Sequence, residues 1–229
     1  MKFTALIIRD RIKAKKGKEL IMLKHLYLMR HGETEFNLEN RVQGWCDSPL
    51  TEKGIRQAEL ARDMLREREI TFTHGYSSPL DRAITTLKYT SPNHMPTETV
   101  TGLKEWGFGS LEGQSRDLMP KPLSAPKTDD YYCQYGGERA SEVCQRINQS
   151  LQTIMSKEDS QQVLAVAHGA VIYQFVKDYL PDPVAGIGNC EIFHFVYDFK
   201  TFTFIENMKP YREMAVSSEN LFAKSDKTL

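Results

Sequence analysis

Short apolar stretches alternate with amphipathic ones along most of the chain. Residues 25–30 (HLYLMR) and 162–167 (QVLAVA) are mostly apolar over the length of a buried strand. Elsewhere apolar residues recur every three or four positions, which is typical of helices with one buried face. This alternation predicts an α/β fold, a three-layer α/β/α arrangement around a mostly parallel central sheet.

Four segments show the helical pattern, and we expect helices over residues 51–68, 79–90, 138–157 and 171–180. Thr51 is the expected N-cap of the first helix, and Pro79 suits the start of the second. The buried faces expected for the first three helices are Ile55, Ala58, Ala61 and Leu65; Leu80, Ala83, Ile84 and Leu87; and Val143, Ile147, Leu151 and Ile154.

Three further stretches complete the expected fold. Residues 73–78 (THGYSS) predict a short strand. Residues 190–206 alternate in polarity around a turn near 198–200, which predicts an antiparallel hairpin at the sheet edge. Residues 114–137 are rich in Pro, Ser and Asp and lack sustained periodicity, so we expect a lid or crossing loop there.

Size and charge add limits to this fold. At 229 residues the chain has room for one sizeable core. We expect one domain over residues 22–207, with a basic extension over 1–21 and a polar tail over 208–229. The 30 basic and 30 acidic residues cancel, so no global field favours nucleic acid or a membrane as a partner.

The extension 1–21 is strongly basic. A disordered basic arm is one interpretation. Another is that translation begins at Met22, with Lys18 and Glu19 encoded by a ribosome-binding sequence; the nucleotide sequence tests this. Secretion fits poorly, because charged residues follow the short apolar stretch TALII.

The cysteines indicate a reducing compartment. Cys46, Cys133, Cys144 and Cys190 are far apart and form no CxxC pair, so neither a disulfide framework nor a zinc site is expected. No apolar run approaches the length of a membrane span. We therefore expect free thiols and a cytoplasmic location.

Two predicted strands end in the same dipeptide. His31 and Gly32 follow the first strand, and His168 and Gly169 follow the strand over 162–167. The carboxyl ends of parallel strands meet at one edge of a sheet, where open α/β folds place their ligand sites. We therefore expect the two histidines to lie together, with glycines that let backbone N–H groups approach a ligand.

Two arginines fit the same edge. Arg30 adjoins His31, and Arg82 lies in the first turn of the helix after residues 73–78. A guanidinium group matches phosphate oxygens bidentately, and helix N-termini add positive potential. The cluster predicts a phosphate or phosphoryl site.

Five segments, in order, resemble the histidine phosphatase superfamily, in its cofactor-dependent phosphoglycerate mutase branch. They are RHGETEFNLENRVQGWCDSPLTEKG, YSSPLDRAITT, LKEWGFGSLEG, YGGERASEVCQR and VLAVAHGAVI. The likeness runs from about Leu23 to Asn207. Arg139 departs from the family, which often has Ser after Gly-Gly-Glu.

The resemblance implies a role for each matching residue. His31 is the implied nucleophile, which becomes phosphorylated, and Glu105 is the implied proton donor to the leaving oxygen. The side chains implied to bind the phosphoryl group are Arg30, Asn37, Arg82 and His168. We add Gly169 as a substrate-site residue, Gln43 and Gly44 as rim residues, and Thr34 as a weak substrate contact.

This chemistry needs neither a metal nor a cofactor. A neutral imidazole can attack phosphorus, and nearby guanidinium groups disfavour its protonated form. The arginines also neutralise charge in the transition state, as metals do elsewhere. A carboxylate then protonates the alkoxide and afterwards activates water. We therefore expect no metal and no cofactor.

The sequence leaves open whether the protein is a hydrolase or a mutase, which differ in the molecule that accepts the phosphoryl group. The segment between Glu105 and Gly136 is short, whereas the resemblance implies a long insertion there in true mutases. We therefore favour a phosphomonoester hydrolase acting on a small phosphorylated metabolite. The alternative is a 2,3-bisphosphoglycerate-dependent mutase, whose second anionic group could be served by Lys104, Arg116, Lys121 and Lys127.

Two other classes fit less well. A non-catalytic phospho-ligand binder would not need Glu105, and a metal hydrolase with His31 and His168 as ligands would place a cation beside two arginines. We expect a monomer or homodimer. The lid residues expected to set leaving-group choice are Phe108, Met119, Tyr131, Tyr132 and Tyr135. The histidines expected to be structural are His25, His74, His94 and His194.

Overall fold

The computed structural model describes residues 23–91, 95–118, 129–180 and 186–210. The predicted extension over 1–21 and all but the first residues of the predicted tail lie outside these ranges. The remaining predictions that fall outside them concern His94, Met119, Lys121 and Lys127.

A six-stranded mixed sheet forms the centre of the molecule. Its strands, in the order β3-β2-β4-β1-β5-β6, are β1 (Lys24–Arg30), β2 (His74–Ser77), β3 (Thr97–Thr99), β4 (Gln162–Ala167), β5 (Ile192–Tyr197) and β6 (Phe202–Met208). The first four in this order run parallel, while β5 pairs antiparallel with both β1 and β6. The predicted α/β fold with an antiparallel hairpin at the edge is confirmed.

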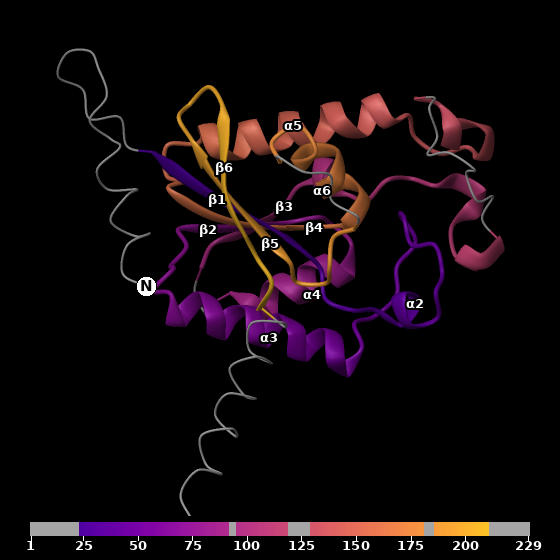
Figure 1. The fold of residues 1–229 in the computed structure, drawn as a ribbon, viewed down its shortest axis with the longest axis horizontal. Coiled ribbons are helices and arrows are strands. Elements are labelled where there is room, and N and C mark those ends of the chain that lie inside the picture. The colour runs from indigo at the N-terminus through magenta and orange to yellow at the C-terminus, as the bar shows by residue number, and fades with distance from the viewer. Residues whose placement is uncertain (1–22, 92–94, 119–128, 181–185, 211–229) are drawn as a thin grey trace, which may run out of the picture.

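Helices cover both faces of the sheet (Figure 1). Helices α3 (Glu52–Glu67) and α4 (Asp81–Thr90) lie on one face, and α5 (Ala140–Ser156) and α6 (Gly169–Val176) lie on the other. Shorter elements lie in the loops: α2 (Glu35–Leu38), η1 (Thr101–Leu103), η2 (Gly109–Leu111), η3 (Arg116–Leu118) and η4 (Tyr131–Tyr135). The two helical layers give two hydrophobic cores, one on each side of the sheet.

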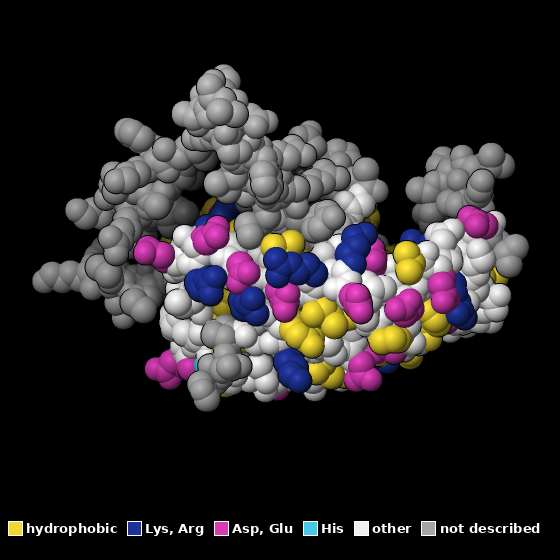
Figure 2. Space-filling view, turned by 90° about the horizontal axis from the view of Figure 1, so that it is seen from below, with side chains coloured by type: hydrophobic (Ala, Val, Ile, Leu, Met, Phe, Trp, Pro, Cys, Tyr) yellow, Lys and Arg dark blue, Asp and Glu magenta, His cyan; other side chains and the backbone are white. Residues whose placement is uncertain are grey.

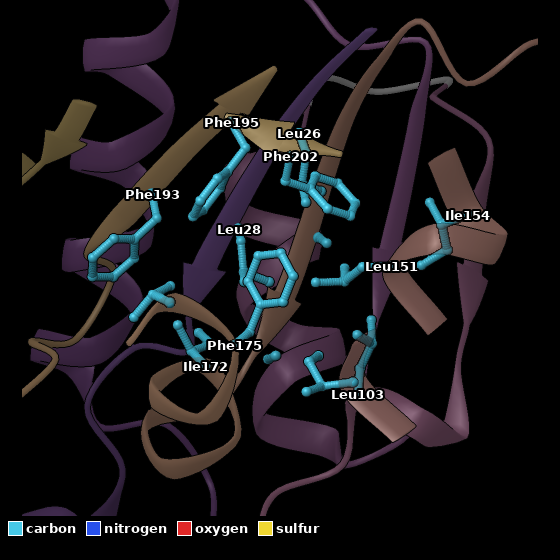
Figure 3. Packing of buried hydrophobic residues seen from close by; sticks show 14 of the residues in the cluster. Leu26, Leu28, Leu103, Leu151, Ile154, Ile172, Phe175, Phe193, Phe195 and Phe202 are labelled. Carbon is cyan, nitrogen blue, oxygen red and sulfur yellow. The ribbon is translucent and has the colours of Figure 1, made fainter. Parts of the chain in front are cut away.

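The core under α5 and α6 is rich in aromatic rings (Figure 3). Phe175 of α6 lies at its centre, with its ring centroid 5.2 Å from those of Phe195 and Phe202 in edge-on geometry. The buried face predicted for α5 is confirmed, since its four members are buried: Val143, Ile147, Leu151 and Ile154. This packing fixes α5 and α6 against the sheet.

Helix α4 departs from the prediction in its exposed face. Ile84 was expected in the buried stripe, but 39 % of its surface is exposed. The buried face is instead formed by Ala83 and Leu87 together with polar residues whose hydroxyl groups bond to helix carbonyls, such as Thr86. Pro79 precedes the N-cap Leu80 and so lies outside the helix rather than at its start.

Strand β3 was not predicted. Its three residues are polar and exposed, so they carry no apolar alternation. Thr97 to Thr99 pair with Gly75 to Ser77 of β2 through the backbone. An edge strand of this kind depends on its partner and not on its side chains.

The outer face of α3 carries charges of both signs. Figure 2, viewed from the α3 and α4 side, shows acidic and basic side chains interspersed with apolar ones. Ion pairs on α3 join Arg56 to Glu59, and Arg62 and Arg66 to Asp63.

Among the described residues, no helix is both long enough and apolar enough to cross a membrane.

Candidate active site

The ends of β1, β2 and β4 bring the predicted residues together. Arg30 is paired with Ala167 across the sheet, and the amide of His31 donates to the carbonyl of Ala167 (3.0 Å). The amide of Ser78, just after β2, donates to Val166 in the same way (2.9 Å). The rings of His31 and His168 consequently lie with centroids 5.1 Å apart.

The environment of His31 leaves one ring nitrogen with its lone pair. The side chain is buried, and its Nδ1 lies 2.7 Å from the carbonyl oxygen of Gly32. Because a carbonyl oxygen only accepts hydrogen bonds, Nδ1 carries the proton and Nε2 keeps its lone pair. Burial, followed by the charges of Arg82 and Arg30, holds the pKa of His31 well below its usual value. His31 is therefore a neutral imidazole with a free Nε2.

His168 has the opposite tautomer. It is the N-cap of α6, and its Nδ1 accepts a hydrogen bond from Nε of Arg82 (3.1 Å). The proton of the neutral ring is thus on Nε2, which is buried and has no partner among the described residues. Burial and the charge of Arg82 lower the pKa of His168 well below its usual value. The ring therefore presents an unsatisfied N–H donor beside His31.

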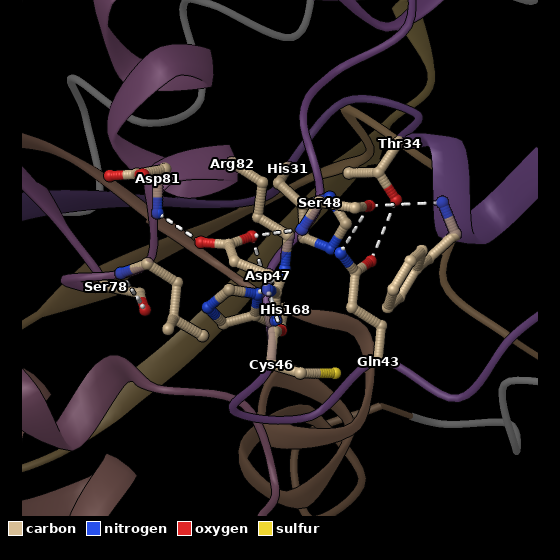
Figure 4. A network of polar contacts seen from close by, with 12 residues as sticks. His31, Thr34, Gln43, Cys46, Asp47, Ser48, Ser78, Asp81, Arg82 and His168 are labelled. Carbon is tan, nitrogen blue, oxygen red and sulfur yellow. Dashed lines mark hydrogen bonds and ion pairs between the residues drawn. The ribbon is translucent and has the colours of Figure 1, made fainter. Parts of the chain in front are cut away.

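Arg82 is held by the loop after α2 (Figure 4). Its side chain is fully buried. Nη1 donates to the carbonyl of Cys46 (2.9 Å) and to Oδ1 of Asp47 (2.8 Å), and Nη2 donates to the carbonyl of Gly44 (2.7 Å). Asp47 also accepts from the amide of Asp81 at the start of α4 (2.5 Å). The guanidinium group is thereby fixed before any substrate binds.

Arg30 supplies a second unsatisfied donor. Its Nη1 donates to the carbonyl of Ile187 (2.6 Å), whereas its buried Nε has no partner in the described part of the chain. A Cβ atom on Gly169 would lie 3.5 Å from this Nε, so Arg30 lies against the first residue of α6. The unpartnered donors of Arg30 and His168 are suited to an anion, because buried N–H groups are otherwise hydrogen-bonded.

Glu105 lies at the same helix end. Only 6 % of its surface is exposed. Oε1 accepts from the amides of Trp106 and Val171 (both 2.9 Å), and Oε2 accepts from the amide of Ala170 (3.1 Å). The N-terminus of α6 therefore holds a carboxyl group near Arg30, whose guanidinium group interacts with its charge.

The other predicted contact residues have structural partners. Oδ1 of Asn37 accepts from the amide of Thr34 (3.3 Å) and from Nδ2 of Asn189 (3.2 Å). Gln43 is buried rather than at a rim, and its side chain bonds to Thr34 (2.8 Å) and Ser48 (3.0 Å). Gly44, also predicted at the rim, contributes its carbonyl to the clamp on Arg82.

Aromatic side chains follow Glu105 along the chain and pack against the described part of the lid. The ring of Tyr132 lies edge-on to those of Trp106 (5.2 Å between centroids) and Phe108 (5.0 Å). Tyr131 and Tyr135 extend this cluster. The proton-donor candidate is thus joined to an aromatic surface.

Three of the histidines expected to be structural lie in the described part of the chain, away from this site. His25 and His194 share a hydrogen bond between Nδ1 and Nε2 (2.9 Å), and the ring of Tyr27 stacks on His194 at 4.3 Å. Burial, followed by the charge of His194, lowers the pKa of His25 to about 4. His74 contacts Asp159 at 3.3 Å.

Several residues that hold the site were missed by sequence reasoning. Asp47 and Ile187 contact the two arginines through a carboxylate and a backbone carbonyl, and Arg146 contacts the backbone around Glu105. The matching segments contain Asp47 and Arg146, but nothing in their spacing indicates their partners. Within the described residues, no three His, Cys, Asp or Glu side chains are grouped so that they could hold a metal ion.

Comparison with known proteins identifies the family of this chain. The family model for the histidine phosphatase superfamily (branch 1) matches residues 26–206. A 2,3-bisphosphoglycerate-dependent phosphoglycerate mutase of Parabacteroides distasonis is 35 % identical over 125 residues, covering 44 % of this chain and 50 % of the relative. The match thus spans only half the length of that curated relative.

Solved structures share the fold over most of their length. The structure of a phosphoglycerate mutase from Bacillus anthracis aligns with a TM-score of 0.69 and 27 % identity, covering 80 % of this chain and 92 % of that one. A mycobacterial glucosyl-3-phosphoglycerate phosphatase aligns with a TM-score of 0.65 and 25 % identity, covering 80 % and 96 %. The chain belongs to the histidine phosphatase superfamily.

Proposed function

We propose that this protein is a phosphomonoester hydrolase that acts through a phosphohistidine on a small phosphorylated metabolite. The observation that carries the proposal is the pair of buried donors on Arg30 and His168 that have no partner among the described residues, beside the unprotonated Nε2 of His31. Together they supply an anion site and a nucleophile at one point. Family membership supports phosphoryl transfer through histidine.

The proposed reaction has two steps. Nε2 of His31 attacks phosphorus and the bond to the leaving oxygen breaks, while the carboxyl group of Glu105 gives that oxygen a proton. Water then attacks the phosphorus as the P–N bond breaks, and the Glu105 carboxylate takes a proton from the water. Inorganic phosphate leaves and His31 returns to its neutral form. The guanidinium groups of Arg30 and Arg82 stabilise the transferring group in both steps.

A mutase is the second candidate, because curated relatives carry that name. In a mutase a second phosphorylated molecule, and not water, would accept the group from His31. The short segment from Glu105 to Gly136 favours hydrolysis. Arg116 could still serve a second anionic group, since its charge acts on Arg30.

The two candidates are separated by measuring where the phosphoryl group goes. The wild-type protein is incubated with a panel of phosphorylated metabolites, and separately with 3-phosphoglycerate and 2,3-bisphosphoglycerate, while free phosphate and isomerisation are both measured. We expect phosphate release with little isomerisation. Rapid isomerisation without phosphate release would replace the hydrolase with the mutase.

The nucleophile is tested by His31→Ala, which we expect to abolish turnover and phosphoenzyme formation. The matched control is His74→Ala, at the far end of β2, which should keep both. Detection of an acid-labile phosphoenzyme in the wild type and the control, but not in His31→Ala, supports the mechanism. Full activity of the His31 variant would exclude it.

A further inference from the structure

Arg146 of α5 donates hydrogen bonds to the backbone carbonyls that precede and include that of Glu105. Nη1 of Arg146 donates to the carbonyls of Gly102 (3.0 Å) and Lys104 (2.6 Å). Nη2 donates to the carbonyl of Glu105 itself (2.8 Å). Three carbonyls within four residues thus converge on one guanidinium group, whose fork is rigid and whose charge strengthens each hydrogen bond.

Glu138 fixes the chain on the other side of Glu105. It accepts from Nε (2.9 Å) and Nη2 (2.8 Å) of Arg146 through both carboxylate oxygens. The same carboxylate accepts from the amide of Gly107 (2.8 Å), and the carbonyl of Glu138 accepts from the indole of Trp106 (2.9 Å). Arg146 and Glu138 therefore hold the chain on both sides of the proton-donor candidate.

The segment around Glu105 is held by contacts from other parts of the chain and not by regular secondary structure. Residues 104–108 belong to no helix or strand, so no regular ladder of hydrogen bonds fixes them. Besides Arg146 and Glu138, Trp45 donates through its indole to the carbonyl of Glu105 (2.9 Å), and Glu112 accepts from the amide of Phe108 (3.1 Å). Arg146 differs from these two in bonding to three carbonyls at and before Glu105. Arg146 is about one-fifth exposed, which leaves its hydrogen bonds partly shielded from water.

The position of the Glu105 carboxyl group depends on this arrangement. Its two oxygens reach three backbone amides, two of them at the N-terminus of α6. α5 and α6 pack against each other on the same face of the sheet (Figure 1). Arg146 thus ties the backbone of Glu105 to one of these helices, while the carboxyl group is held by the other.

We propose that Arg146 is a positioning residue for proton transfer by Glu105, acting through the carbonyls of residues 102, 104 and 105. This inference rests on the proposed function. A displacement of about 1 Å in a reacting group can cost roughly a hundredfold in rate. Loss of the guanidinium group should therefore impair the protonation of the leaving oxygen and leave phosphoryl binding largely intact.

Leaving-group dependence tests the proposal. For Arg146→Ala we expect kcat/KM to fall roughly a hundredfold with an alkyl phosphate such as glycerol phosphate, whose alkoxide needs a proton. With dinitrophenyl phosphate, whose phenolate leaves without one, we expect kcat/KM within a few fold of the wild type. Because kcat/KM reports formation of the phosphoenzyme, later hydrolysis does not obscure the comparison.

A double-mutant cycle with Glu105→Gln separates positioning from general structural support. If Arg146 acts through Glu105, adding Arg146→Ala to Glu105→Gln should lower kcat/KM for the alkyl ester only a few fold more. Arg146→Lys keeps one charged donor and should recover part of the loss. Arg139→Ala is the matched control, because it removes an exposed arginine from the start of the same helix and should retain wild-type activity.

The failures of the two proposals are distinguishable. Equal losses with both esters, additive losses in the cycle, or no loss in Arg146→Ala would each overturn the role of Arg146, while wild-type phosphate release upholds the hydrolase. If Arg146→Ala does not fold, Glu138→Gln replaces it, with the same ester selectivity expected at smaller size. A wild type that releases no phosphate from either ester would overturn both proposals.

Discussion

At the scale of single residues, the site depends on which nitrogen of each histidine carries a proton. A carbonyl fixes the tautomer of His31, and the Nε donor of Arg82 fixes that of His168. One ring is left with a lone pair and the other with an N–H group, although both are neutral. Two adjacent histidines therefore take different roles without any difference in charge.

Replacing Arg82 tests this electrostatic arrangement. Arg82→Ala removes the positive charge that, after burial, does most to lower the pKa of His31, so the pKa of His31 should rise. NMR titration of the imidazole nitrogens measures this directly. The loss of transition-state stabilisation should be about 3 kcal/mol in kcat/KM. Arg62→Ala, on the surface of α3, should change neither value; an unchanged His31 titration in Arg82→Ala would contradict the interpretation.

Sequence reasoning located the histidines and arginines because they lie at strand and helix ends that periodicity defines. The residues that hold them could not be found in this way. Asp47 and Arg146 contact groups 35 and 41 positions or more away in the chain, partly through backbone carbonyls. A carbonyl is present at every residue, so its use as a partner leaves no mark on composition.

At the scale of elements, α4 shows why periodicity predicts the presence of a helix more securely than it predicts which face of the helix is buried. Arg82, Thr86 and Thr90 are buried on this helix because they have hydrogen-bond partners there, and Ile84 is consequently turned outward. Hydrophobicity alone assigns such polar residues to the surface. Strand β3 was missed for a related reason. Backbone pairing with β2, and not burial of its side chains, holds it in the sheet.

Two substitutions within α4 compare how much its buried and its exposed face contribute to the free energy of unfolding. Leu87 is buried in the core beneath α3 and α4, and we expect Leu87→Ala to lower the free energy of unfolding by about 3 kcal/mol. Ile84→Ala should change it by less than about 1 kcal/mol, because 39 % of the residue's surface is exposed and it belongs to neither hydrophobic core. Urea denaturation compares the two. A larger loss for Ile84 than for Leu87 would contradict the assigned faces.

At the scale of the whole molecule, buried neutral histidines make stability depend on pH. The folded-state pKa of His25 is about 4, below the value of about 6.5 for an unfolded chain. Between these values the unfolded chain binds a proton that the folded protein excludes. The contribution of His25 to stability is therefore fully present above pH 6.5 and is lost as the pH falls toward 4.

The prediction is tested with His25→Gln, which removes the titrating group from the β1–β5 contact. On lowering the pH from 7 to 4.5, the wild type should lose about 2 kcal/mol more unfolding free energy than this variant, allowing for partial exposure of the ring. Urea denaturation at both values measures it. Tyr27→Phe keeps the stacked ring and should behave as the wild type does, whereas identical losses in wild type and His25→Gln would refute the assignment.

The clamp on Arg82 has an evolutionary consequence. Its acceptors come from the loop at residues 44–47 and from the end of β4, whereas the aromatic surface beside Glu105 is built from residues 106–108 and η4. The two sets touch, because the indole of Trp45 donates to the carbonyl of Glu105 (2.9 Å) and a Cβ atom on Gly44 would meet the carbonyl of Trp106 and the ring of Phe108. Under the proposed function, selection is therefore expected to change the preferred leaving group mainly through η4, because substitutions at residues 106–108 also reach the loop that holds Arg82.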